Sequence, residues 1–297
     1  MTDILAIVGP TASGKSRIAH RLALQLDAQV ISADSMQVYR SMDIGTAKPT
    51  RLEREEVKYH LIDIVEPEET FTVADYQERG RAVLESLEQV IIVGGSGLHF
   101  RSLVDELRFP PHDPELRAGI EAMSTEEQRA ELLRLDPGAG DHIDLANARR
   151  VIRALEIAMI TGEVPSGRDS GGMRTYQSHF AFRAVGIDPG DRIAQRIDDR
   201  LDEMMAAGLM AEIGALAERM GRTASQAVGY RQLIPVLGGD SSLEEGLAAT
   251  RRATLSLARQ QRTFFRRDPR IAWLPWSDDE DARHRGVWSA FERVETS

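Results

Sequence analysis

The sequence predicts an α/β protein in which a parallel sheet is flanked by helices and carries an inserted helical domain. Three observations lead to this prediction. A glycine-rich loop joins an apolar run at residues 4–8 to a stretch with helical spacing at 17–26. Other short apolar runs, such as 29–33 and 90–93, alternate with helical stretches, as in parallel sheets. A proline-rich break at 109–114 then opens a long region without strand-like runs.

The glycine-rich loop reads GPTASGKS and fits the pattern G-x-x-x-x-G-K-[ST] between a strand and a helix. Glycine permits the backbone angles that turn successive N–H groups inward, and the following helix adds its positive end. The fold is therefore predicted to be a P-loop NTPase-like sheet whose loop holds a di- or triphosphate. A chance match of a short turn is the alternative. The phosphate-binding candidates are Gly9, Pro10, Thr11, Ala12, Ser13, Gly14, Lys15 and Ser16.

Two of the following strands end in polar residues. Asp34 comes after the strand predicted over 29–33, and open α/β sheets bind ligands at the carboxyl ends of their strands. A helix cap or a ligand to a metal-bound water is the alternative for this carboxylate. The strand over 90–93 runs into Gly-Gly-Ser-Gly, with Ser96 as its polar residue. An ATPase of this class usually places a magnesium-binding acid there, and this chain has none.

The intervening elements follow from periodicity. Residues 42–49 have no apolar period, so they are predicted to form an ordered loop over the site. Residues 60–65 are predicted to be a third short strand, and 71–87 a helix with a rough apolar face.

The proline-rich break marks the start of the insertion. Residues 109–114 contain three prolines, which cannot continue a helix. We therefore predict a core domain from residues 1–112 and 178–297, and a helical insertion from 113–177, with Ser170-Gly171-Gly172 as a flexible exit. Within the insertion, residues 146–160 form one amphipathic helix. Its apolar face holds Val151, Ile152, Leu155, Ala158 and Met159, and Arg149, Arg150 and Arg153 project from the other side.

After the insertion the pattern returns to the core. Strand character is restored over 180–187, and 192–216 is predicted to be a core-packing helix pair. A further helix runs from about 243 to 266, and 271–274 can add a terminal strand. The acidic tail from Ser277 is predicted to be peripheral. On the last long helix one quadrant holds Arg251, Arg259, Arg262 and Arg266, interrupted by Leu255.

Composition excludes several classes of protein. The chain of 297 residues has no cysteine, so disulfides, thiolate metal sites and cysteine nucleophiles are excluded. It shows neither a basic leader nor an apolar run long enough for a membrane span, so a cytoplasmic enzyme without membrane contact is expected. The net charge of −10 argues against binding to nucleic acid. The local clusters of arginine argue the other way.

With these residues in place, the chain resembles the bacterial type of tRNA dimethylallyltransferases, also called tRNA isopentenyltransferases. The resemblance runs from Ile4 to about Trp273. Besides the phosphate loop, six motifs occur in family order: ISADSMQVYRSMDIGTAKP, HLIDIVEPEETFTVADYQ, VIIVGGSGLHF, RRVIRALEIAMITG, QAVGYRQ and ARQQRTFFRR.

Some positions depart from the family pattern. The family usually has threonine at Ser96, which keeps the hydroxyl, and tyrosine at His99. It usually has an Asn-Asp-x-x-Arg run where this chain has Asn147-Ala148-Arg149-Arg150. Relatives often carry arginine at Leu255 and Gln260, so no tRNA contact is assigned to these two positions.

The resemblance implies transfer of a dimethylallyl group from its diphosphate to N6 of the adenosine beside the tRNA anticodon. It implies that the phosphate loop binds the departing diphosphate, with Mg²⁺ held through Ser16. Asp34 would act as general base, and Lys15 and Ser96 would complete the catalytic set. The target base would have to swing out of its stack. The protein is expected to act as a monomer.

The same resemblance implies which residues bind tRNA, although a lone arginine is more often a solvated or salt-bridged surface group. Around the flipped base these are Asp34, Ser35, Met36, Gln37 and Ser96; along the anticodon stem-loop they are Arg117, Arg149, Arg150, Arg153, Gln226, Gly229, Tyr230, Arg231, Arg259 and Arg262.

Two other functions use the same loop. A nucleotide-dependent small-molecule kinase would bind ATP under a lid of arginines. A non-catalytic RNA-binding switch would bind a nucleotide and leave Asp34 without a role.

Overall fold

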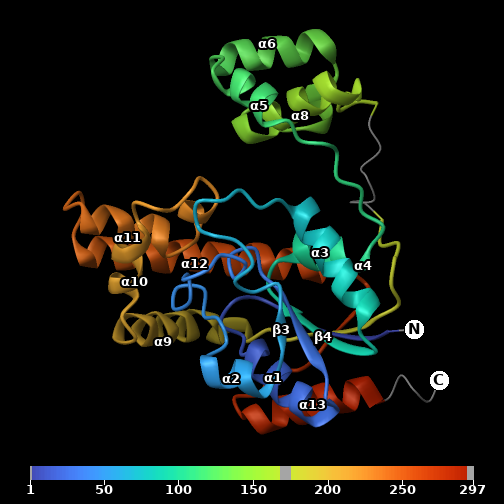
Figure 1. The fold of residues 1–297 in the computed structure, drawn as a ribbon, viewed down its shortest axis with the longest axis vertical. Coiled ribbons are helices and arrows are strands. Elements are labelled where there is room, and N and C mark those ends of the chain that lie inside the picture. The colour runs from blue at the N-terminus through green and yellow to red at the C-terminus, as the bar shows by residue number, and fades with distance from the viewer. Residues whose placement is uncertain (1, 168–174, 293–297) are drawn as a thin grey trace. The chain divides into compact units, whose positions relative to one another are not determined.

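The structure, a computed structural model, describes residues 2–167 and 175–292 and forms two compact units (Figure 1). One unit comprises Met1–Asp105 and Ser178–Ser297, and the other comprises Glu106–Gln177. The sequence placed the first boundary at 112/113, within the proline-rich break, whereas the chain leaves the first unit at Asp105. The predicted exit at Ser170-Gly171-Gly172 lies outside the described residues.

The first unit is built on a six-stranded parallel sheet with the order β3-β2-β4-β1-β5-β6. The predicted α/β fold class is therefore confirmed. The strands are β1 (Asp3–Val8), β2 (Gln29–Ala33), β3 (Tyr59–His60), β4 (Gln89–Gly94), β5 (Arg183–Gly186) and β6 (Ile271–Trp273). The central strands are buried on both faces, which explains their continuous apolar runs.

Helices cover both faces of this sheet. On one face, Leu5, Ile7 and Ile91 pack with residues of α1 (Lys15–Leu26) and α13 (Glu280–Glu292). On the other face, Ile4 and Ile92 pack in a larger cluster. Its helices are α3 (Val73–Ser86), α4 (Gly97–Val104), α9 (Ile193–Ala206), α10 (Leu209–Leu216), α11 (Tyr230–Leu237) and α12 (Leu243–Arg266).

Two predictions about this unit are wrong. The predicted strand over 60–65 ends at His60, because Leu61 and Asp63 adopt positive φ angles of 60° and 54° and turn the chain. The acidic tail from Ser277 is not peripheral, because α13 buries Val287 and Phe291 against the sheet. Its apolar residues are sparse, and the acids before them conceal the helix in the sequence. The short helix α2 (Arg51–Glu56) was also not predicted.

The second unit is all-helical within its described residues. It contains α5 (Pro114–Glu121), α6 (Thr125–Leu135), α7 (Ala139–His142) and α8 (Ala148–Thr161) around a small apolar core. Asn147 caps α8 by accepting a hydrogen bond from the Arg150 N–H, and Gly162 ends it in the left-handed region. Met159, predicted on the apolar face, is 52% exposed. No helix among the described residues has the length and apolar character to cross a membrane.

Candidate active site

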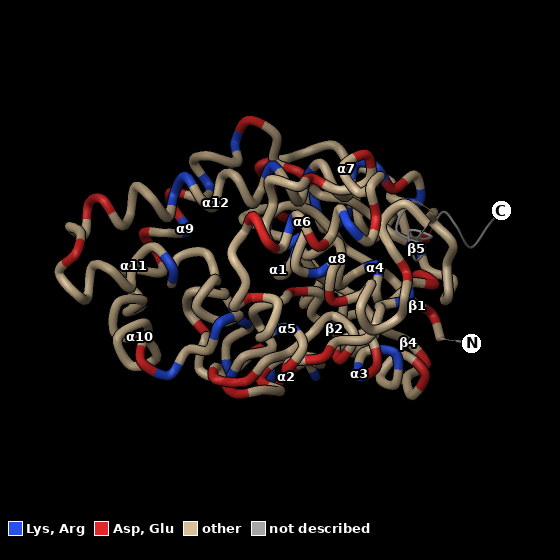
Figure 2. The backbone as a smooth tube through the Cα atoms, turned by 90° about the horizontal axis from the view of Figure 1, so that it is seen from above, with Lys and Arg blue, Asp and Glu red and all other residues tan. Residues whose placement is uncertain are grey.

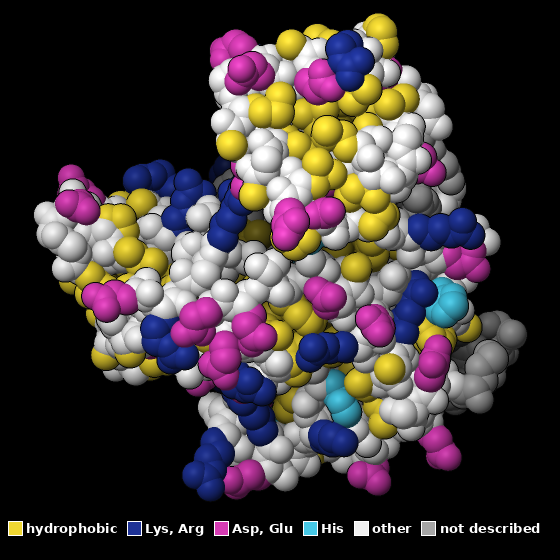
Figure 3. Space-filling view, turned by 45° about the horizontal axis from the view of Figure 1, so that its top comes forward, with side chains coloured by type: hydrophobic (Ala, Val, Ile, Leu, Met, Phe, Trp, Pro, Cys, Tyr) yellow, Lys and Arg dark blue, Asp and Glu magenta, His cyan; other side chains and the backbone are white. Residues whose placement is uncertain are grey.

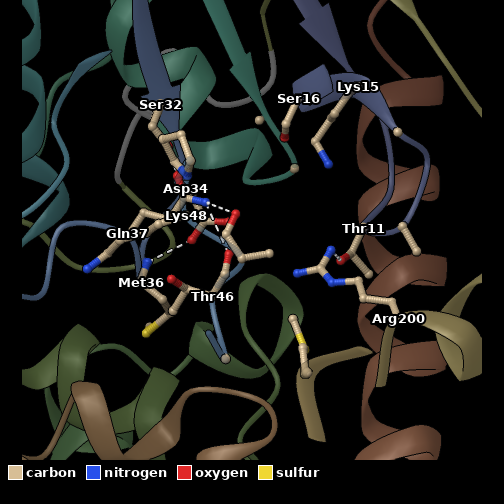
Figure 4. Close-up of a pocket in the computed structure, with 18 of the residues that line it drawn as sticks. Thr11, Lys15, Ser16, Ser32, Asp34, Met36, Gln37, Thr46, Lys48 and Arg200 are labelled. Atoms are coloured by element: carbon tan, nitrogen blue, oxygen red, sulfur yellow. Dashed lines mark hydrogen bonds between the residues drawn. The ribbon is translucent and has the colours of Figure 1, made fainter. Parts of the chain in front are cut away.

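The topology brings the phosphate loop, Ser96 and Asp34 to one edge of the sheet. Strand β4 lies between β1 and β2, and its last residue, Gly94, is in register with Val8 and Ala33. The segments that follow these three strands therefore leave the sheet side by side, at its carboxyl edge. They line a cavity of about 1430 Å³. Figure 4 shows Asp34 and Gln37 on one side of it and Lys15, Ser16 and Thr11 on the other.

The phosphate loop requires glycine at two positions. Gly9 has a φ of 151°, and a Cβ there would lie 2.1 Å from the backbone oxygen of Ile187. Gly14 has a φ of 80° and forms the N-cap of α1, so it directs the chain into the helix whose positive end faces the loop. One predicted contact is revised: the Thr11 N–H already donates to Gln261 Oε1 at 2.8 Å, so it is not free for a phosphate.

Lys15 is a buried cation that faces the cavity. It is 8% exposed, and its Nζ donates to the backbone oxygen of Pro10 at 3.2 Å. Burial, followed by the positive charge of Arg200, lowers the pKa of Lys15 to about 8, although Asp34 acts in the opposite direction. A phosphate ligand would relieve this electrostatic cost, since it would neutralise both cations.

Arg200 is the main site residue that the sequence analysis missed. It lies on α9, donates to Thr11 Oγ1 at 2.9 Å and points into the same cavity as Lys15 (Figure 4). Burial lowers the pKa of Arg200. Among the described residues no carboxylate lies within ion-pair distance of it. The sequence held one signal: Arg200 follows the inward-facing Ile197 by three positions, where a core-packing helix would carry an apolar residue.

Asp34 and Gln37 form the opposite wall. Asp34 Oδ1 accepts a hydrogen bond from the Met36 N–H at 2.8 Å, which leaves Oδ2 without a hydrogen-bond partner among the described residues. Gln37 Oε1 accepts from the Ser32 hydroxyl at 2.6 Å, and Nε2 donates to the backbone oxygens of Thr46 and Ala47. Gln37 was predicted to pair with a base edge, but in this structure its amide is fully engaged by the protein.

Ser96 is held between the two walls. Its N–H donates to the Ala33 oxygen, and its Oγ lies 2.7 Å from His99 Nδ1. Burial lowers the pKa of His99 to about 4, so the imidazole is neutral near pH 7 and can accept or donate this hydrogen bond. The Tyr76 and His99 rings pack in a T-shaped arrangement with their centroids 4.7 Å apart, and the Tyr76 hydroxyl donates to the Ser32 oxygen at 2.6 Å. His99 therefore fixes the orientation of the Ser96 hydroxyl.

The loop predicted over 42–49 is ordered, and Glu212 holds it. The Glu212 carboxylate accepts hydrogen bonds from the backbone N–H groups of Asp43, Ile44 and Gly45 and from the Tyr230 hydroxyl. Tyr230 is 0% exposed. This revises its predicted role, because a side chain without exposed surface supports the loop rather than meeting RNA.

Several arginines predicted to bind tRNA have partners within their own unit. In the helical unit, Arg117 and Arg153 surround the buried Glu156 together with His112, and Arg153 also donates to the backbone oxygens of Pro110 and Pro111. In the first unit, Arg262 pairs with Asp188 at 2.7 Å. Gly229 is buried at the start of α11. The candidates that remain exposed are Arg149, Arg150, Gln226, Arg231 and Arg259.

A metal site built only from side chains is not found in the part of the chain that the structure describes. No group of three or more His, Asp or Glu residues there is arranged to hold an ion. Ser16 is exposed at the start of α1 and lines the cavity beside Lys15. A hydroxyl oxygen suits Mg²⁺, which commonly completes its shell with phosphate oxygens and water.

The fold and the site together define a phosphate-loop α/β protein in which the loop faces a carboxylate across one cavity. A family profile described as IPP transferase matches residues 37–268. A tRNA dimethylallyltransferase of Thermobifida fusca is 44% identical over 93% of this chain and 91% of its own length, and one of Streptomyces avermitilis is 43% identical over 91% and 89%. The chain belongs to the IPP transferase family, which confirms the resemblance.

Solved structures agree with this assignment. The tRNA isopentenylpyrophosphate transferase of Bacillus halodurans has a TM-score of 0.71 at 34% identity, with 99% of this chain and 98% of that chain covered. A eukaryotic dimethylallyltransferase acting on tRNA has a TM-score of 0.79 at 22% identity, over 99% and 80% of the two chains, and shows the shared fold. The kinase and the non-catalytic alternatives receive no support from these comparisons.

Proposed function

We propose that this protein transfers the dimethylallyl group of dimethylallyl diphosphate to N6 of the adenosine next to the anticodon of tRNA, and releases diphosphate. One observation carries this proposal. A phosphate loop, a strand-end carboxylate and a hydroxyl face one cavity, while the strand between them ends in Gly94-Gly95 instead of an acid. Such a site suits a diphosphate leaving group and an amine nucleophile, and it does not aim a water molecule at a terminal phosphate.

The leaving group would bind to the phosphate loop. As the bond between the allylic carbon and the diphosphate oxygen breaks, negative charge grows on the diphosphate. Lys15 and Arg200 would neutralise this negative charge, together with the N–H groups of the loop and the positive end of α1. When bound through Ser16, Mg²⁺ would supply further charge stabilisation.

The nucleophile would enter opposite the loop. The lone pair of N6 is delocalised into the adenine ring, so the amine attacks well only if its proton is accepted during the reaction. Asp34 is suited to this task, because one carboxylate oxygen is anchored by the Met36 N–H and the other is available. The new N6–carbon bond forms, the N6 proton passes to Asp34, and diphosphate departs. Ser96, oriented by His99, can hydrogen-bond the amine or the diphosphate.

The tRNA anticodon stem-loop would be held by the exposed basic residues. Acidic and basic residues are interspersed along the backbone (Figure 2), and their side chains lie among one another on the face shown in Figure 3. Binding therefore depends on local contacts, not on the net charge of −10. We expect tRNA affinity to fall about tenfold or more between 50 and 200 mM salt, since each phosphate contact releases counterions. Filter binding at several salt concentrations measures this, and a flat response contradicts the proposed contacts.

Mass spectrometry of tRNA tests the reaction itself. The protein is incubated with tRNA, Mg²⁺ and dimethylallyl diphosphate, and the product is digested to nucleosides. We expect a mass increase of one dimethylallyl group on a single adenosine, with one diphosphate released per group. Unchanged tRNA, together with ATP turnover when ATP replaces the prenyl donor, would contradict the proposal.

A further inference from the structure

Two arginines lie beside the phosphate loop, at the start of α1. Arg196 comes from α9 and Arg283 from α13. A Cβ built on Gly14 would lie 3.4 Å from Arg196 Nη2 and 3.7 Å from Arg283 Nη2. Both side chains line the same cavity as Lys15. Three sources of positive charge, two guanidinium groups and the helix end, therefore meet at one residue of the loop.

No carboxylate compensates this charge within ion-pair distance, among the described residues. The acids that face Arg283 from its own segment are Asp278, Asp279 and Glu280. Each of them pairs with a different arginine: Asp278 with Arg192 at 3.3 Å, Asp279 with Arg285 at 3.5 Å, and Glu280 with Arg17 at 3.0 Å. Arg196 donates instead to the backbone oxygen of Ala12 at 2.6 Å.

Burial, hydrogen bonds and ring contacts hold the two arginines in place despite the repulsion between like charges. Arg283 is only 7% exposed, donates to the backbone oxygens of Ser277 and Asp278, and has an Nε without a partner. Both guanidinium groups lie over the ring of Trp276, at 5.1 Å for Arg196 and 4.4 Å for Arg283. Burial, followed by the charge of Arg196, lowers the pKa of Arg283. A guanidinium group presents a planar set of N–H donors that matches phosphoryl oxygens, so the two groups beside Gly14 are suited to bind one phosphoryl group.

We propose that Arg196 and Arg283 form an outer phosphoryl subsite of the phosphate loop, so that the C-terminal segment from Trp276 to Arg283 takes part in binding diphosphate. This inference rests on the proposed function, because it assigns the ligand of the loop. The ligand class is an inorganic or prenyl diphosphate with its magnesium. Arg283 neutralises charge on the phosphoryl group that lies nearest Gly14, while Lys15 and Arg200 act on the same ligand from their own positions in the cavity lining.

Calorimetric titration with magnesium diphosphate tests the subsite in the full chain. We expect Arg283→Gln to weaken diphosphate binding about tenfold, the loss of one charge-assisted contact, and Arg283→Lys to weaken it less. Arg285→Gln is the matched control, since Arg285 lies on the same helix and is well exposed. It should leave the affinity unchanged. The affinity for tRNA should be the same in all four proteins.

The outcomes separate this inference from the proposed function. If wild type binds diphosphate and Arg283→Gln binds it equally well, the subsite is refuted while the transferase proposal stands. If wild type binds no diphosphate, both fail. Should Arg283→Gln not fold, wild-type crystals soaked with magnesium diphosphate decide the question. A phosphoryl oxygen at hydrogen-bond distance, about 3 Å, from Arg283 Nη2 supports the subsite, and one out of reach overturns it.

An ATP titration, run in parallel, shows whether the site prefers a nucleotide to diphosphate. Such a preference would also overturn the diphosphate assignment.

Discussion

Sequence patterns predicted ligand-binding residues both at the carboxyl edge of the sheet and on the arginine-bearing helices, but the structure treats the two groups differently. At the sheet edge, the phosphate loop, Asp34 and Ser96 line one cavity. On the helices, Arg153 and Arg262 are engaged within their own units. A loop motif requires one particular backbone geometry, and only a few kinds of ligand fit that geometry. A charged side chain on a helix has many partners available, so a cluster of arginines does not by itself indicate RNA.

The largest effect is expected at the sheet edge, from Asp34→Asn. Without a proton acceptor the turnover number should fall about 10²- to 10⁴-fold, while the affinities for tRNA and diphosphate stay within a few-fold of wild type. Steady-state kinetics with radiolabelled dimethylallyl diphosphate measures this. Asp27→Asn, at the exposed left-handed end of α1, is the control and should be fully active. Full activity of Asp34→Asn would show that the Asp34 carboxylate does not take part in the reaction.

Arg200→Gln should have the next largest effect. It removes a cation from the cavity, so kcat/KM for dimethylallyl diphosphate should fall about 10²-fold, and Arg200→Lys should recover part of the loss. Arg252→Gln, on an exposed position of α12, serves as the control. If Arg200→Gln left the kinetic constants unchanged, the buried guanidinium would have a purely structural role.

A third substitution tests whether the arginines of the helical unit are structural. Glu156 is 0% exposed and accepts hydrogen bonds from His112, Arg117 and Arg153. Burial raises its pKa, but the hydrogen bonds from Arg153 and His112 outweigh burial and lower the pKa overall. We expect Glu156→Gln to destabilise this unit by about 2 kcal/mol, because the half-buried guanidinium groups of Arg117 and Arg153 lose the counter-charge that they share.

Unfolding in urea, monitored through hydrogen exchange of the α8 amides, measures that loss of stability. Glu163→Gln, an exposed position after the same helix, is the control and should be neutral. An unchanged stability would mean that Arg153 and Arg117 do not depend on Glu156 and are available to another partner.

The smallest expected effect is a pH dependence of diphosphate binding. The pKa of Lys15 is lowered to about 8, so its ammonium loses its charge as the pH rises from 7 to 9. Affinity for diphosphate should therefore fall several-fold across this range. Lys15→Arg keeps its charge and should show no such inflection, whatever its absolute affinity. Calorimetry at matched ionic strength measures both proteins. The same inflection in both would assign the effect to another group.

How far the sequence predicted the structure depends on the range of the interactions. The phosphate loop, β2 and the helical insertion were predictable because their signals are local: glycine spacing, apolar runs and a proline-rich break. Arg200 and Gln261 were not, because they reach the loop from α9 and α12, far away in sequence. Helix α13 was missed because only tertiary packing, at Val287 and Phe291, distinguishes it from a solvated acidic tail.

The resemblance supplied what local patterns could not, and the structure then refined it residue by residue. It pointed to the Gln226–Arg231 stretch as an RNA contact. Within that stretch Tyr230 is a buried partner of Glu212, while Arg231 remains exposed. Motif membership identifies a residue that matters, but burial and partners decide whether it touches the ligand or supports the loop that does.

The most direct test is a crystal structure of the protein with an anticodon stem-loop and a non-reactive thio analogue of dimethylallyl diphosphate. We expect the diphosphate on residues 12–16 with the prenyl group pointing into the cavity, and the flipped adenine with its N6 about 2.6–3.2 Å from the Asp34 carboxylate. An adenine whose N6 lies beyond reach of Asp34, or a diphosphate bound away from the loop, would contradict the proposed reaction.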